Sequence, residues 1–103
     1  MTDKELLELA AKAAGINGGW HEGSNMFWTG FMSWDPLRRD DHALRLAVKL
    51  RLCMSYEDDG QVVDVWHYDT CDNSTEEFHG GDPCAATRRA IVRAAAEIGK
   101  GMK

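Results

Sequence analysis

The chain has 103 residues, of which 44 % are apolar and 28 % charged, and its formal net charge is −5. This length predicts one small domain over residues 1–103, and the sequence holds no run of about 18 apolar residues that would span a membrane. The acidic balance disfavours direct nucleic-acid binding, because the phosphate backbone attracts cations. Three cysteines are too few, and odd in number, for a disulfide scaffold, which indicates reduced thiols in the cytoplasm.

The first predicted element is a helix in TDKELLELAAKAAG, residues 2–15. Thr2 and Glu5 have the spacing of a capping box, and Gly15 is the residue type that ends helices in the left-handed conformation. The predicted apolar face comprises Leu6, Leu9, Ala10, Ala13 and Ala14. The glycine-rich stretch 15–25 then predicts a loop, and the aromatic stretch 26–30 predicts a short strand.

A second helix is predicted over about 41–51, with Asp40 or Asp41 as its N-cap. Placed at about 100° per residue, its leucine, alanine and valine side chains cover most of the circumference. The polar side chains that cluster on the remaining side are His42, Arg45 and Lys49. A helix with so little polar surface is expected to be largely buried.

The stretch LCMSYEDDGQVVDVWHY, residues 52–68, predicts a β-hairpin. Asp59-Gly60 supplies the residues of a type I′ turn, and apolar side chains alternate on both sides of it. Residues 69–82 are polar and acidic, which predicts a loop.

The last predicted helix covers residues 83–98, with Asp82 as its N-cap and Pro83 at its first position. Its buried face is predicted to comprise Ala86, Ala90, Ile91, Ala94, Ala95 and Ile98, while Arg88, Arg89 and Arg93 face outward. Gly99 would end the helix and leave residues 99–103 as a frayed tail. The order helix, strand or strands, helix, β-hairpin, helix predicts an α+β fold, with an antiparallel sheet of three or four strands packed with three helices.

Acidic residues concentrate in one part of the chain. From Leu52 to Thr87 there are nine acids and no lysine or arginine, so this part carries −9, and the remainder carries +4 because the whole chain carries −5. A field of one sign steers a basic partner toward the surface that bears it. The predicted partner-binding residues are Glu57, Asp58, Asp59, Asp64, Asp69, Asp72, Glu76 and Glu77.

A second candidate is a nucleotide-binding site. The guanidinium groups of Arg88, Arg89 and Arg93 would hold phosphates, and the rings of Trp66 and Tyr68 would stack on bases, across an interface between copies of the chain. The alternative is a purely structural role, in which these arginines form the solvent-exposed face of an alanine-rich helix.

A third candidate is a metal site. His67, Cys71, His79 and Cys84 lie within 18 residues and form a Cys2His2 set that zinc accepts, although no C-x2-C knuckle is present. The alternative is that each of the four has a separate structural role. No nucleophile motif or glycine-rich cofactor motif occurs, so the sequence predicts a non-enzymatic protein without a cofactor.

Three stretches resemble a group of small proteins of tailed bacteriophages and prophages. They are ELLELAAKAAGI (residues 5–16), WDPLRRDDHALRLAVKL (34–50) and AATRRAIVRAAAEIG (85–99). The layout is also similar to the phage α-β-α sandwich domains. The resemblance implies a phage accessory protein that acts in the cytoplasm of the host bacterium, where small phage proteins often counter host defences.

The predicted function is therefore stoichiometric binding of a host protein with a basic surface, such as a defence protein, through the acidic hairpin and loop. The first alternative is a sponge that sequesters a nucleotide second messenger, and the second is a zinc-binding or hydrolytic protein.

Overall fold

The computed structural model describes residues 2–30, 32–57, 62–68, 73–77 and 82–102, with the backbone alone described for Glu57 and residues 73–77. In chain order the elements are α1 (Asp3–Ala14), β1 (Gly19–His21), β2 (Met26–Trp28), β3 (Ser33–Trp34), α2 (Asp40–Leu50), β4 (Leu52–Glu57), β5 (Val62–His67), β6 (Asn73–Glu77) and α3 (Pro83–Lys100). The predicted α+β class and element order are confirmed. The strands divide between two antiparallel sheets, ordered β1-β2-β3 and β4-β5-β6.

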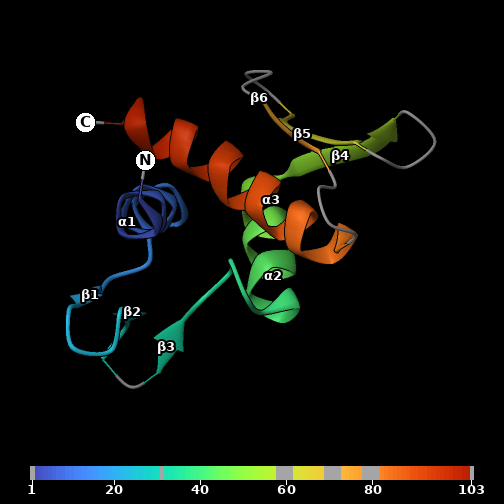
Figure 1. The fold of residues 1–103 in the computed structure, drawn as a ribbon. Coiled ribbons are helices and arrows are strands. Elements are labelled where there is room, and N and C mark those ends of the chain that lie inside the picture. Colours follow the sequence, from blue (N-terminus) through green and yellow to red (C-terminus); the bar gives the residue numbers. More distant parts are fainter. Residues whose placement is uncertain (1, 31, 58–61, 69–72, 78–81, 103) are drawn as a thin grey trace.

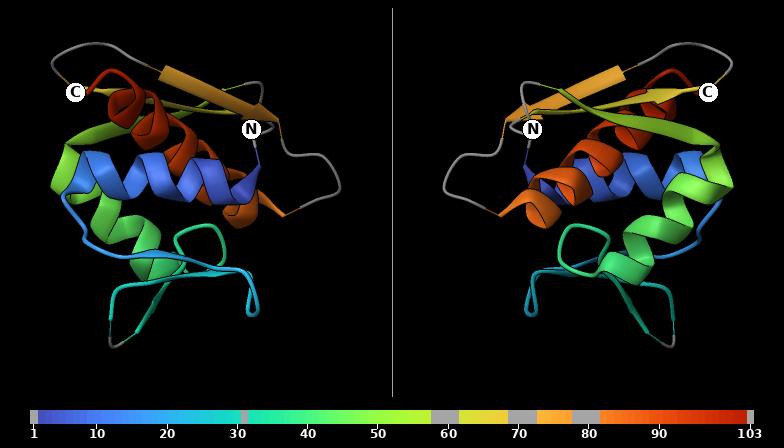
Figure 2. Two further views of the ribbon diagram at one scale, coloured as in Figure 1. Left: turned by 90° about the vertical axis from the view of Figure 1, so that its left-hand side faces the viewer. Right: turned by 90° about the vertical axis from the view of Figure 1, so that its right-hand side faces the viewer.

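The helices lie between the two sheets. Figure 1 shows α3 across the centre of the molecule with the β4-β5-β6 sheet on one side, and Figure 2 shows the small β1-β2-β3 sheet on the opposite side, beyond α1 and α2. Helix α3 packs against α1 and α2 as well as against β5 and β6. The core therefore forms around α3, which contacts every other helix.

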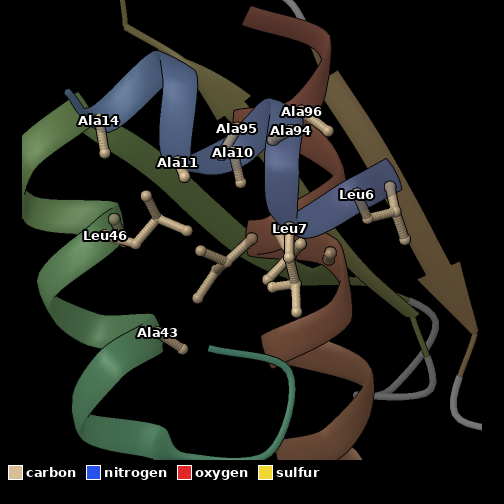
Figure 3. Close-up of a cluster of buried hydrophobic side chains, with 14 of the residues drawn as sticks. Leu6, Leu7, Ala10, Ala11, Ala14, Ala43, Leu46, Ala94, Ala95 and Ala96 are labelled. Atoms are coloured by element: carbon tan, nitrogen blue, oxygen red, sulfur yellow. The ribbon is translucent and has the colours of Figure 1, made fainter. Parts of the chain in front are cut away.

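Helix α1 begins and ends as its sequence predicts. The side chain of Thr2 accepts a hydrogen bond from Glu5 N, Glu5 completes the capping box, and Gly15 adopts a left-handed φ of 71°. The buried face comprises Leu6, Leu7, Ala10, Ala11 and Ala14, and Figure 3 shows it facing alanines of α3 together with Ala43 and Leu46 of α2. Leu7 and Ala11 are buried in place of Leu9 and Ala13 because α1 turns this side toward α2 and α3.

The prediction that α2 is buried on nearly all sides is wrong. Leu44 and Val48 are 62 % and 69 % exposed, whereas His42, assigned to the polar side, is 5 % exposed. The buried face consists of His42, Ala43, Leu46 and Ala47, because α2 packs on the rest of the domain through one side only. His42 is stabilised there by its Nδ1 atom, which accepts a hydrogen bond from the Asp35 N–H at 2.8 Å.

The start of α2 also differs from its prediction. Arg39 occupies the N-cap position without a side-chain capping bond, and Asp40 and Asp41 lie in the first turn. Both carboxylates bind arginines, Asp40 with Arg88 and Asp41 with Arg39, so neither serves as a cap. Their charges still favour the positive end of the helix.

The hairpin register runs from the pair Leu52 and His67 to the pair Glu57 and Val62, as the alternation predicts. The predicted Asp59-Gly60 turn lies outside the described residues. On β5, Val63 and Val65 are fully buried and form the face that packs on α3. The prediction of a loop over 69–82 is wrong for Asn73–Glu77, which pairs with β5 as an edge strand. A polar edge strand lacks the apolar alternation that identifies strands in a sequence.

Helix α3 begins as predicted, with the Asp82 carboxylate accepting a hydrogen bond from Ala85 N at 3.0 Å and Pro83 in the first turn. It extends to Lys100, so Gly99 does not end it. Gly99 is buried against α1, and a Cβ atom placed on it would lie 2.0 Å from the Leu9 carbonyl oxygen. The glycine thus permits the close approach of the two helices, and the predicted tail is helical at its start.

Candidate functional site

A groove with mainly apolar walls opens where α2, β4 and α3 meet. Its volume is about 240 Å³, and its lining residues are Asp40, Ala43 and Leu44 of α2, Met54 and Tyr56 of β4, and Pro83, Cys84, Thr87, Arg88 and Ile91 of α3. Figure 1 shows the three elements converging at this point. We refer to it as the α2–β4–α3 groove.

The groove exists because α3 does not lie under the whole sheet. Met54 and Tyr56 are the register partners of Val65 and Val63, so all four side chains point to the same face. Helix α3 covers this face at β5 and β6. The edge strand β4 extends past it, which leaves Met54 and Tyr56 36 % and 55 % exposed.

Leu44 extends the same apolar surface from the side of α2. It is 62 % exposed and lines the groove, and Val48, one helical turn further on, is exposed as well. Large apolar side chains that gather on one surface of a small domain are typical of a binding site. The sequence does not reveal this surface, because its pattern predicts that Leu44 is buried.

The polar side of the groove is held by an ion pair. Nη1 of Arg88 lies 2.6 Å from Oδ1 of Asp40, and its Nε donates to the Leu37 carbonyl oxygen at 2.9 Å. The Arg88 side chain is only 16 % exposed, so the prediction that it faces outward is wrong. These bonds engage the Nε and Nη1 atoms of Arg88 and join α3 to the start of α2.

Within one copy of the chain, the other members of the nucleotide candidate lie apart. Arg89 is half-exposed and lies 3.6 Å from the Asp3 carboxylate, and Arg93 is exposed on the same helix. Trp66 alternates with Val65 on β5 and therefore points to the sheet face away from α3. Tyr68, just beyond β5, is 66 % exposed. The rings and the guanidinium groups thus belong to different surfaces of one copy, and a joint site would require the predicted interface between copies.

The predicted acidic surface is described in part. Asp64 lies on β5 between Ser55 of β4 and Thr75 of β6, Glu57 ends β4, and Glu76 and Glu77 belong to β6. Asp58, Asp59, Asp69 and Asp72 lie outside the described residues. Tyr56 directly precedes the acidic segment 57–82, and Pro83 directly follows it. Because both residues line the groove, the two ends of the acidic segment meet there.

Of the four candidate zinc ligands, His67 ends β5 and Cys84 lies exposed in the first turn of α3. Cys71 and His79 lie outside the described residues. Within the described part of the chain, no group of three or more histidine, cysteine or acidic side chains could hold a metal ion.

Comparisons of the chain with protein families, with curated proteins and with solved structures find no match. Among the described residues, no helix is long and apolar enough to cross a membrane. The fold and the groove define the chain as an α+β domain with an exposed apolar groove beside an acidic segment.

Proposed function

We propose that the chain is a non-enzymatic binding domain that holds one protein partner through the α2–β4–α3 groove and the acidic segment 57–82. The observation that carries the proposal is the meeting of both ends of this cation-free segment at the groove, next to Tyr56 and Pro83. The partner would present an apolar side chain for the groove, with lysine or arginine side chains around it.

The two parts of the surface would act differently. Buried apolar anchors dominate the affinity of protein interfaces, and a single well-packed anchor contributes about 2 kcal/mol or more. Acidic residues around the anchor accelerate encounter with a basic partner and exclude acidic ones, and their effect weakens with added salt. Substitutions in the groove should therefore mainly change the dissociation rate constant of the complex, and substitutions of the acidic residues should mainly change its association rate constant.

The resemblance to tailed-phage proteins supports a partner in the cytoplasm of a host bacterium, such as a defence protein. A stoichiometric antagonist needs a specific surface but no catalytic group. The groove and the acidic segment supply such a surface.

The test is affinity capture from a bacterial lysate with the wild-type chain and two variants, followed by mass spectrometry. We expect one protein to be captured by the wild type and lost with Leu44→Asp and with the triple reversal Asp72→Lys, Glu76→Lys and Glu77→Lys. The matched control reverses three acids outside this segment, Glu8→Lys, Glu22→Lys and Glu97→Lys, and should still capture it. Equal capture by all variants would overturn the proposal.

A further inference from the structure

A second cavity lies on the opposite side of α2 from the groove. Its volume is about 390 Å³, and it is lined by Ala14 and Ile16 after α1, by Met32 and Trp34 of the first sheet region, and by Arg39, Asp41, His42, Arg45, Leu46 and Lys49 of α2 and its N-cap. None of these residues lines the groove. The cavity is therefore a separate site, and inferences about it do not depend on the proposed function.

A buried histidine supplies this cavity with a hydrogen-bond donor. Nδ1 of His42 accepts from the Asp35 N–H at 2.8 Å, so the neutral ring carries its proton on Nε2. No described residue accepts a hydrogen bond from this Nε2–H. His42 is nevertheless only 5 % exposed, and buried polar groups in proteins are normally paired.

The cavity is an opening that the Nε2 atom of His42 can face. No fully buried side-chain nitrogen or oxygen of the described residues lacks a hydrogen-bond partner, so Nε2 must reach an opening. The cavity is such an opening, and His42 is part of its wall. The donor is thus held in place by the backbone N–H of Asp35 and can be presented to a molecule from outside the chain.

Two cations stand beside this donor. Arg45 and Lys49 lie one helical turn apart on the exposed side of α2, and neither has an ion-pair partner among the described residues. Arg39 does not add to their charge, because its Nη2 lies 3.0 Å from the Asp41 carboxylate. The local excess of positive charge is notable in a chain whose net charge is −5.

We propose that this cavity binds a small aromatic anion. Its oxyanion would accept a hydrogen bond from the His42 Nε2–H and face Arg45 and Lys49, and its ring would lie against Ile16 and Met32. Pockets of about 300–1,000 Å³ with apolar walls and a few polar groups are typical of small-molecule sites. A phosphate and a carboxylate offer the same oxygen acceptors, so both head groups belong to the proposed class.

The test is calorimetric titration of the full chain with phenyl phosphate and with benzoate, with benzyl alcohol as the uncharged control. We expect at least one anion to bind with a Kd of about 1 mM or tighter and the alcohol not to bind. The double variant Arg45→Gln and Lys49→Gln should weaken binding about ten-fold or more. The matched variant Arg93→Gln and Lys100→Gln removes the same charges from α3 and should leave the Kd unchanged.

A readout on the histidine keeps the test independent of any variant. In the wild-type chain, the bound anion should shift the ¹⁵N resonance of His42 Nε2 and leave that of Nδ1 in place. Absence of binding by both anions would overturn the proposal, as would an unmoved His42 Nε2 resonance or equal loss in the two double variants.

Discussion

Leu44 and Leu46 lie two residues apart on α2, and truncation of each to alanine should have very different effects on stability. Leu46 is 3 % exposed and packs between α1 and α3, so Leu46→Ala should lower the free energy of unfolding by about 3–5 kcal/mol. Leu44 is 62 % exposed and keeps less than half of its surface out of water. Leu44→Ala should therefore cost at most about 1 kcal/mol.

Urea denaturation followed by far-ultraviolet circular dichroism measures both changes. With an m-value of about 1.5 kcal/mol per molar urea, the two unfolding midpoints should differ by roughly 1 M or more. The two variants remove the same atoms from the same helix, so each is the control for the other. Equal losses would refute the one-sided packing of α2 and, with it, the exposure of Leu44 in the groove.

Two further predictions concern a helix contact and a surface ion pair. Gly99→Ala should cost about 2 kcal/mol in urea denaturation, because its Cβ would lie 2.0 Å from a carbonyl oxygen of α1. Gly101→Ala, whose Cβ would lie at an ordinary contact distance of 3.6 Å from the Ile98 carbonyl oxygen at a φ of −82°, should be neutral or stabilise by less than about 1 kcal/mol. Equal costs at the two glycines would contradict the close helix contact. The hydrogen bond from Arg39 lowers the pKa of Asp41 below its ordinary value of 3.8. The ionised pair therefore stabilises the fold at pH values above 3.8, and this contribution to stability is lost as the pH falls through the lowered pKa. Carboxyl NMR titration should show the pKa of Asp41 rising in Arg39→Gln; an unchanged value would exclude the pair as the cause.

Local signals in the sequence predicted most of the fold. Some features depend only on residues that are close together in the sequence, which is why the sequence predicts them. These are the capping box of Thr2 and Glu5, the N-cap at Asp82 and the alternation of the hairpin. The sequence does not reveal strand β6, because backbone pairing with β5 holds this polar edge strand and its side chains show no apolar alternation.

The groove was missed because tertiary packing decides it. A helix with apolar side chains on most of its circumference can bury any side, and only its neighbours determine that Leu46 faces inward and Leu44 outward. The role of Arg88 depends on Asp40, which is 48 residues away in the sequence. The sequence pattern places His42 on the polar side of α2, because its bond to the Asp35 backbone forms only in the folded chain.

The most direct test of the proposed function is methyl NMR of the labelled chain, titrated with the protein captured from lysate. We expect the methyl resonances of Leu44, Met54 and Ile91, which line the groove, to shift or broaden. Those of Ile16 and Met32, on the other side of α2, should stay unchanged. A partner seated in the α2–β4–α3 groove would be contradicted if only the resonances of Ile16 and Met32 changed. It would also be contradicted if no methyl resonance of either set changed.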